Sequence, residues 1–283
     1  GPPPIRPVRV VTVEERAALF AADSERGERV VVEIGGLPFP SRPSRGNGHF
    51  VAEVAVAEGV AGGTVPFRAR PDRKGARTVE GTLRLLGAEG VSVISDVDDT
   101  VKDSAVLVRE ELVANTFYRP FRAIEGMPAL YGAWRERGAA VHYVTASPWQ
   151  LFPPLWEFLA GSGLGGVSIE MREVRLANAS VVHLFRDTRA YKTGRIREIL
   201  DRFPGRAFVL VGDSGERDPE IYAAIARERP GQVRGIFLRA VVPEHRDRSR
   251  YRETFLGVED DRWIVFDDAG TLPLDLAEWV RGR

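Results

Sequence analysis

The sequence has no cysteine, only four histidines and two methionines, and no long apolar run. The lack of cysteine excludes disulfides, thiolate metal sites and cysteine nucleophiles, and it fits a reducing compartment. The histidines show no metal-ligand spacing, and no run approaches the roughly 20 apolar residues that a membrane span needs. With no signal peptide recognised either, we expect a cytoplasmic protein that meets a membrane only peripherally.

The chain also lacks an excess of charge of either sign. Lysine plus arginine and aspartate plus glutamate number 40 each, so the net charge is zero. Such a field does not favour bulk nucleic-acid binding. The length of 283 residues and the hydrophobic share of 43% allow one large domain or two smaller ones.

Residues 1–88 contain short alternating segments separated by glycine and proline clusters, which is typical of an antiparallel β-sandwich. The expected strands are 30–34, 50–56, 64–69 and 78–86, with a short helix at 13–22 and a loop at 70–77. We predict a first domain at 1–88 and a second at 89–283.

In the second domain apolar strands alternate with helical patterns, which predicts an α/β fold with a mainly parallel sheet. The expected strands are 91–95, 140–145, 207–212, 233–238 and 263–266. The expected helices are 105–115, 127–137, 154–161, 193–202, 219–228 and 274–281. Asp218 before Pro219, and Ser147 before Pro148, suit the N-cap and first position of a helix.

A cluster of acidic side chains follows the first apolar strand of this domain, in the run Asp96-Val97-Asp98-Asp99-Thr100. Ligands bind at the carboxyl ends of strands in open α/β sheets. Two carboxylates two residues apart suit a nucleophile that also binds metal and a partner that donates and accepts protons. The alternative is a helix cap or a solvated turn, and this run alone does not decide between them.

Four more polar residues follow downstream in an ordered series: Thr145 ends a strand, Lys192 precedes a helix, Asp213 ends a strand and Asp218 opens a helix. Taken singly, each can be a turn residue, a solvated lysine or a cap. Taken together, they place several carboxylates at one sheet edge, where mutual repulsion favours a bound cation. Hard oxygen ligands of this kind suit Mg²⁺.

The order strand-DxDxT, strand-Thr, Lys, strand-GDxxxxD resembles the four-motif signature of the haloacid dehalogenase superfamily, over about residues 91–267. The resemblance implies a Rossmannoid parallel sheet and an aspartyl-phosphate on Asp96. It implies Mg²⁺ held by Asp96, the backbone carbonyl of Asp98, and Asp213, with Asp218 as a ligand or outer-shell acid. The Asp98 side chain would move protons, and Thr145 and Lys192 would hold the phosphoryl oxygens. Thr100 and Ser147 are further candidates for contact with substrate. Arg239 begins a basic stretch whose default interpretation is a solvated face, but its place near a strand end makes it a candidate to bind an anionic head group.

The runs 94–102, 144–149 and 212–222 further resemble the catalytic domain of the actin-patch phosphatidate phosphatase family. Both insertion points for a cap domain are short, so the site is expected to be open and suited to a large substrate. The resemblance implies phosphatidate or a related phospholipid, with Phe117, Tyr118, Trp149 and Phe152 as candidate membrane-facing aromatics. Trp156 and Leu159 are expected in the core.

Two other functions remain open from the sequence. A phosphatase of nucleic-acid 3′ ends would also have an open site, but it would need a basic groove. A non-catalytic binding module would not need Asp96 and Asp98. The run 161–166 matches GxGxxG but follows a helix, so it predicts a helix end and not a dinucleotide site. The oligomeric state is not indicated.

Overall fold

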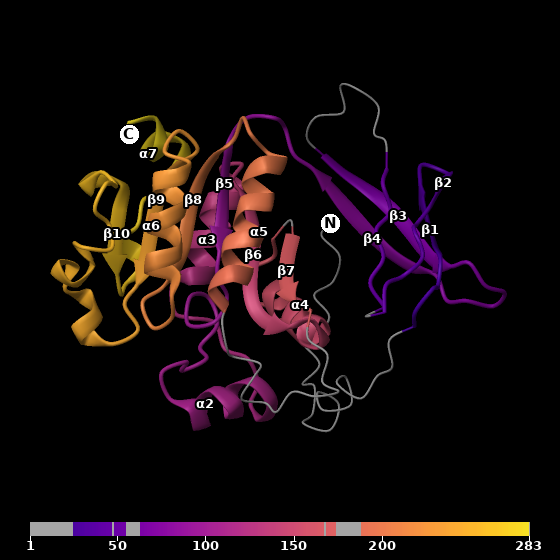
Figure 1. Ribbon diagram of the computed structural model, residues 1–283, viewed down its shortest axis with the longest axis horizontal. Helices are drawn as coiled ribbons and strands as arrows, with labels where there is room; N and C mark the ends of the chain where they lie inside the picture. The colour runs from indigo at the N-terminus through magenta and orange to yellow at the C-terminus, as the bar shows by residue number, and fades with distance from the viewer. Residues whose placement is uncertain (1–24, 47, 55–62, 167, 174–187, 283) are drawn as a thin grey trace. The chain divides into compact units, whose positions relative to one another are not determined.

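The computed structural model describes residues 25–46, 48–54, 63–166, 168–173 and 188–282. The described chain forms two compact units that divide after Ala88 (Figure 1). The helix expected at 13–22 lies outside the described residues. None of the helices in the described part is long and apolar enough to cross a membrane.

The first unit contains an antiparallel sheet in the order β2-β1-β3-β4. Its strands are β1 Val30–Ile34, β2 Leu37–Pro40, β3 Gly63–Pro71 and β4 Val79–Leu85. Gly35 and Gly36, with φ of 57° and 80°, supply the two left-handed residues of the tight β1–β2 hairpin. Residues 50–54 are not a strand, contrary to prediction. One sheet is described here, so the second layer of a sandwich stays a prediction.

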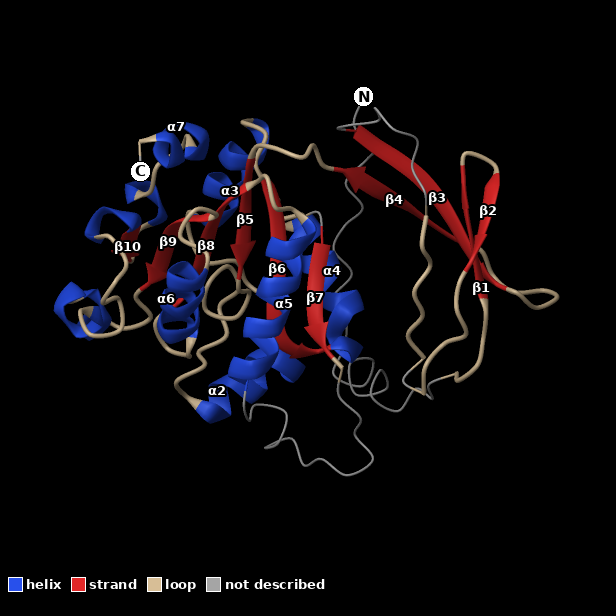
Figure 2. Ribbon diagram, turned by 45° about the horizontal axis from the view of Figure 1, so that its top comes forward, coloured by secondary structure: helices blue, strands red, loops and turns tan. Residues whose placement is uncertain are grey.

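The second unit is built on a six-stranded parallel sheet in the order β10-β9-β8-β5-β6-β7 (Figure 2). Its strands are β5 Val91–Ser95, β6 Ala140–Pro148, β7 Ser168–Arg172, β8 Ala207–Asp213, β9 Val233–Arg239 and β10 Trp263–Phe266. All five residues of β5 are buried, because a central parallel strand is covered on both faces. The predicted α/β fold is confirmed, and the edge strand β7 is an addition to it.

Helices cover both faces of this sheet. They are α2 Arg109–Val113, which continues as a π-helical turn over Ala114–Tyr118, α3 Met127–Glu136, α4 Phe152–Gly161, α5 Thr188–Arg202, α6 Asp218–Glu228 and α7 Leu276–Arg281. One core cluster joins α3, α4 and α7 to alternate strand residues such as Val93 and Val209. The other joins α5 and α6 to the residues between them, such as Ile94 and Leu210. The sheet therefore lies between two apolar layers.

Two predicted helix caps are wrong. Arg217 is the N-cap of α6, and Asp218 is already helical, with its carboxylate turned toward a buried lysine. Ser147 lies inside β6, which runs to Pro148, and its hydroxyl donates to Asp98. In both cases a side chain expected to cap a helix instead faces the polar groups at the carboxyl edge of the sheet. All strands of the sheet run parallel, so the residues that end them meet at that edge.

Candidate active site

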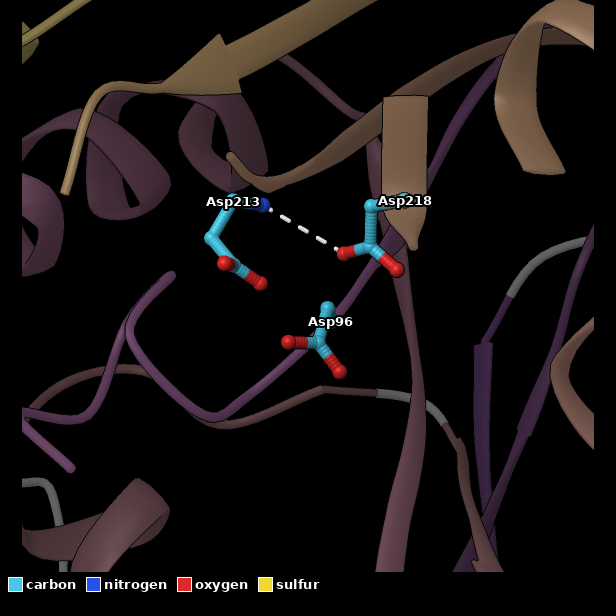
Figure 3. A group of neighbouring side chains, drawn as sticks. All are labelled: Asp96, Asp213 and Asp218. Carbon is cyan, nitrogen blue, oxygen red and sulfur yellow. Dashed lines mark hydrogen bonds between the residues drawn. The ribbon is translucent and has the colours of Figure 1, made fainter. Parts of the chain in front are cut away.

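Three carboxylates from two neighbouring strand ends and one helix start converge at the carboxyl edge of the sheet (Figure 3). Asp96 follows β5, Asp213 ends β8, and Asp218 opens α6. Each offers an oxygen within 4.8 Å of an oxygen of the other two, and all three residues are buried. The backbone N–H of Asp213 donates to the Asp218 carboxylate at 3.3 Å, and that of Asp96 donates to the carbonyl of Val211 at 2.9 Å. These bonds fix the strand ends side by side.

The charge of this cluster is partly neutralised by a fully buried lysine. Lys192 of α5 places its Nζ 3.0 Å from Asp96 Oδ1, 2.8 Å from Asp218 Oδ1 and 3.0 Å from Glu216 Oε2. Burial lowers the pKa of Lys192, but the carboxylates of Asp218, Asp96 and Glu216 outweigh it and hold that pKa well above the ordinary value. The lysine is therefore charged, and it links the nucleophile candidate to the loop that carries Asp213.

The single positive charge of Lys192 does not neutralise the carboxylates of Asp96, Asp213 and Asp218. Burial raises the pKa of Asp96 well above its usual value; Lys192 opposes this shift, and Asp218 adds to it. Burial and the neighbouring Asp218 likewise raise the pKa of Asp213. The Oδ2 atom of Asp213 is buried and has no hydrogen-bond partner among the described residues. An unpartnered carboxylate oxygen beside two others is a donor set that fits a hard divalent cation such as Mg²⁺.

Asp98 faces a second polar cluster. Its Oδ1 is 2.8 Å from the Nζ of Lys102 and accepts a hydrogen bond of 2.6 Å from the hydroxyl of Ser104. Its Oδ2 accepts hydrogen bonds from the hydroxyls of Thr145 at 3.2 Å and Ser147 at 3.0 Å. Burial raises the pKa of Asp98, but Lys102 and the hydrogen bonds from Ser104 and Ser147 outweigh it and lower the pKa to about 2. The Asp98 side chain is thus ionised, whereas burial favours the protonated form of Asp96.

Thr100 and Arg239 also lie at this edge, in different roles. The Thr100 hydroxyl donates to Asp96 Oδ2 at 3.5 Å, which is long for such a bond. Arg239 ends β9 and donates from Nη1 to the carbonyl of Asp99 at 2.7 Å, so it supports the loop after β5. Its Nε is buried and has no hydrogen-bond partner within the described part of the chain. All the predicted site residues therefore gather at one edge, in two adjoining groups.

Three members of the site were not predicted from the sequence: Lys102, Ser104 and Glu216. Lys102 is four residues beyond Asp98, and Glu216 lies between the predicted acids Asp213 and Asp218. Their short distance along the sequence from predicted residues is the signal that could have identified these two. Asp99 was also missed as a loop anchor. It adopts a left-handed φ of 51°, and its carboxylate accepts hydrogen bonds from three successive backbone N–H groups, those of residues 104–106. These three hydrogen bonds, which we name the Asp99 bracket, hold the loop that follows β5.

Comparison with known proteins agrees with this geometry. Residues 91–240, just over half of the chain, match the family model described as the phosphatidate phosphatase APP1 catalytic domain. The phosphatidate phosphatase APP1 of Saccharomyces cerevisiae is 31% identical over 166 residues, which cover 55% of this chain and 28% of that protein. An uncharacterised protein of Schizosaccharomyces pombe is 33% identical over 164 residues, or 56% of this chain and 27% of that protein.

The chain thus spans under a third of the length of the curated relatives that it matches. The matched region contains β5, β6, β8 and β9, and with them the carboxylates, hydroxyls and lysine at the edge of the sheet. The predicted family resemblance is confirmed. The chain belongs to the family of the phosphatidate phosphatase APP1 catalytic domain.

Proposed function

We propose that this chain is a Mg²⁺-dependent phosphatase that hydrolyses a phosphomonoester through an aspartyl-phosphate on Asp96, with phosphatidate as the leading substrate. The observation that carries the proposal is the convergence of Asp96, Asp213, Asp218 and Lys192 at one buried point. A carboxylate can attack a phosphate only if the repulsion between the two anions is offset. The buried ammonium supplies part of that offset.

A divalent cation held by Asp96 and Asp213, with Asp218 beside them, would supply the remaining positive charge and would polarise the phosphoryl group. The residues present fit it, since they offer hard oxygens and one of these oxygens has no other partner. The Asp98 carbonyl, given by family resemblance, completes the proposed set. Lys192 opposes the rise in the pKa of Asp96 that burial causes, and its contacts with Asp96 and Asp218 orient the attacking carboxylate.

In the first step an oxygen of Asp96 attacks phosphorus while the bond from phosphorus to the alkoxide breaks. The alkoxide needs a proton, and Asp98 is the acid placed to give it. The carboxylate of Asp98 is ionised in the free site because Lys102 lowers its pKa. Binding of an anionic phosphoryl group beside Asp98 favours the uptake of the proton that it then donates.

In the second step water attacks the phosphorus of the aspartyl-phosphate, passes a proton to Asp98 and frees Asp96 and inorganic phosphate. Asp98 suits this step because it is a carboxylate with two fixed oxygens. Thr145 and Ser147, which donate to Asp98 in the free site, can turn to phosphoryl oxygens when substrate enters. Arg239 supports the β5 loop and can offer its unpartnered Nε to an anion at the same edge.

The substrate proposal rests on the relative in Saccharomyces cerevisiae, whose name gives phosphatidate as its substrate, and on the absence of a large insertion. The chain between Thr100 and β6 forms α2, the π-helical turn and α3, and has no further domain. A site of this kind can act on a lipid without enclosing it. The same lack of an inserted domain after β5 would suit a nucleic-acid 3′ end, so that substrate belongs in the test.

The experiment measures phosphate released from phosphatidate vesicles, a soluble aryl phosphate and a 3′-phosphorylated oligonucleotide, with Mg²⁺ or with EDTA. We expect Mg²⁺-dependent release that is fastest on phosphatidate. Asp96→Asn should lower the rate by at least about 10³-fold, since it removes the nucleophile. The control is Asp260→Asn, because the Asp260 side chain is 90% exposed and far from the site in sequence.

Two results would contradict the proposal. Equal release by Asp96→Asn and the unchanged chain would remove Asp96 as nucleophile. Release that persists at full rate in EDTA would remove the metal. Preference for the oligonucleotide would leave the chemistry intact and replace the lipid substrate.

A further inference from the structure

Exposed apolar side chains are unevenly distributed over the second unit. Among its described residues, five of the seven large apolar side chains that are exposed lie on the segments that directly follow β5 and β6. These five, which we name the apolar rim, are Leu107, Val108, Tyr118, Trp149 and Trp156. The other two are Leu256 and Leu274. The rim residues therefore lie on the two segments that leave the strand ends bearing Asp96, Asp98, Thr145 and Ser147.

One half of the rim is a row of stacked rings. Trp149 stacks on Phe152 with ring centroids 4.8 Å apart, and Phe152 stacks on Trp156 at 5.8 Å. Trp149 and Trp156 are 36% and 41% exposed, whereas Phe152 packs partly against the core. The expectation that Trp156 belongs to the core is therefore wrong, and Leu159 alone of that pair is buried. The row begins two residues after Ser147, which donates to Asp98.

The outer face of α4 carries little charge. Its exposed positions are Pro153, Trp156, Glu157, Ala160 and Gly161, of which Glu157 alone is ionisable. An outward helix face of a water-exposed protein is normally polar. Exposed apolar side chains gathered on such a face, beside a row of stacked rings, suit a site of interaction.

The other half of the rim is held by the loop after β5. The Asp99 carboxylate accepts hydrogen bonds from the N–H groups of Ser104, Ala105 and Val106, and Leu107 and Val108 follow at once. Leu107 is 50% exposed, and Tyr118, at the end of the π-helical turn, is 62% exposed. Both ribbon views place α2 beyond the carboxyl ends of the strands (Figures 1 and 2). The side chain of Phe117 lies outside what the structure describes.

The reactive side chains of the site are buried, and this determines how close the rim must come to a lipid substrate. Asp96 is 1% exposed, and Asp213 and Lys192 are buried with it, so a phosphoryl group must enter fully to react. In a phosphatidate-like lipid only the glycerol backbone separates the phosphate from the acyl chains, and these chains stay in the bilayer. The residues around the entrance must then come to the level of the lipid head groups. A polar rim would hold the site away from the lipid.

We infer that the apolar rim inserts into the interfacial layer of a phospholipid bilayer and seats the entrance of the site on a lipid phosphomonoester, an inference that rests on the proposed lipid substrate. Indole and phenol side chains favour this layer because a flat apolar ring is joined to a polar group. The rim contains two tryptophans and a tyrosine, together with two aliphatic side chains on the segment that follows β5. The occupant is thus a lipid surface and not a single acyl chain in a groove.

The test uses the Asp96→Asn chain, so that lipid is bound but not consumed, and measures its flotation with phosphatidylcholine vesicles that contain phosphatidate. Leu107→Ser combined with Trp156→Ser should lower the vesicle partition coefficient about tenfold or more, because it removes two inserted apolar side chains. Leu256→Ser combined with Leu274→Ser removes the exposed apolar side chains outside the rim and should leave partitioning unchanged. Thermal unfolding of each variant checks that the fold is kept.

A second readout compares activity in the chain with an intact Asp96. The rim variant should lose about tenfold in the ratio of its rate on vesicle phosphatidate to its rate on a soluble aryl phosphate, and the control variant should keep the ratio. Lipids brominated near the head group should quench tryptophan emission, and Trp149→Phe with Trp156→Phe should remove most of that quenching.

Several outcomes would overturn the inference. These are no flotation of the Asp96→Asn chain, an equal loss in both double variants, or self-association that depends on Trp156, which would make the rim an interface between copies. If no substrate releases phosphate but flotation still depends on the rim, the proposed function fails while the docking surface stands.

Discussion

Replacement of Asp213 by asparagine tests the proposed metal site through the stability of the protein, without reference to activity. In the free site the carboxylates of Asp96, Asp213 and Asp218 have oxygens within 4.8 Å of one another. Two unit charges at that separation repel by about 3 kcal/mol at an effective dielectric constant near 20. Lys192 and local relaxation reduce this repulsion. We therefore expect Asp213→Asn to stabilise the metal-free protein by about 1–2 kcal/mol.

Asparagine suits the test because it preserves the local hydrogen bonds. Asp213 Oδ1 accepts from the N–H groups of Gly215 at 2.6 Å and Glu216 at 3.0 Å, and asparagine Oδ1 can do the same. The amide NH₂ replaces Oδ2, the atom without a partner, and can donate to a neighbouring carboxylate. The substitution thus removes one charge and one proposed metal ligand and leaves the hydrogen bonds of the loop intact.

The assay is thermal unfolding in EDTA and in Mg²⁺ at about 100 times its dissociation constant. Binding to the folded state alone adds about 2.7 kcal/mol, which for a unit of this size raises the Tm of the unchanged protein by about 5–10 °C. Asp213→Asn should have the higher Tm in EDTA and shift by less than about 2 °C with Mg²⁺. Asp260→Asn should behave like the unchanged protein. An equal Mg²⁺ shift in Asp213→Asn, or a lower Tm in EDTA, would refute the assignment of Asp213 as a metal ligand.

Three further substitutions test the packing around the site. Burial, together with Arg206 and Arg202, lowers the pKa of His142 from 6.5 to about 4, so the unfolded chain binds a proton more readily than the folded one. As the pH falls from 6.5 to 4, the free energy of unfolding measured by urea titration should therefore decrease by about 3 kcal/mol. His142→Phe should abolish this decrease. A Cβ on Gly212 would lie 2.3 Å from Asp218 Oδ2, so Gly212→Ala should displace Asp218 and lower kcat at least tenfold with expression retained. Gly194→Ala is the control, because a Cβ at Gly194 would meet open space, and it should leave kcat unchanged. Equal rates for the two variants would mean that Asp218 need not stay in place. Leu159→Ala should lower the free energy of unfolding by about 2–5 kcal/mol, because Leu159 is buried. Leu256 is exposed, so Leu256→Ala should lower it by less than about 0.5 kcal/mol. Similar losses in the two variants would contradict the packing of α4.

The sequence was most informative where burial leaves little choice of residue. The runs that form β5, β6, β8 and β9 are mainly apolar and almost entirely buried, because both faces of a central parallel strand are covered. The turn at residues 161–166 was also predicted correctly, since α4 ends at Gly161 and Gly163 adopts a left-handed φ of 74°.

Two of the edge strands, β2 and β7, were not predicted. β7, Ser168–Arg172, is a sheet edge of mixed polarity, and β2, Leu37–Pro40, contains two prolines, which edge strands tolerate. Neither is a run of buried residues such as a central strand shows. The predicted helix over 105–115 is shorter in the structure because the Asp99 bracket fixes its first residues as a loop.

Within the site, residue order predicted which strand ends carry polar groups, but not which atoms meet. That Lys192 contacts Glu216 as well as Asp96 depends on the path of the loop after β8. That Lys102 pairs with Asp98 depends on the left-handed turn at Asp99. Both are properties of backbone conformation, which residue spacing alone does not determine.

The most direct test of the central claim is to detect the covalent intermediate. The protein is mixed with substrate labelled in its phosphoryl group and with Mg²⁺, quenched in acid within one turnover, and digested for peptide mapping. The account predicts label on the peptide that contains Asp96, and no label in Asp96→Asn or in EDTA. Label on another residue, or turnover by the unchanged protein with no labelled peptide at any quench time, would contradict it.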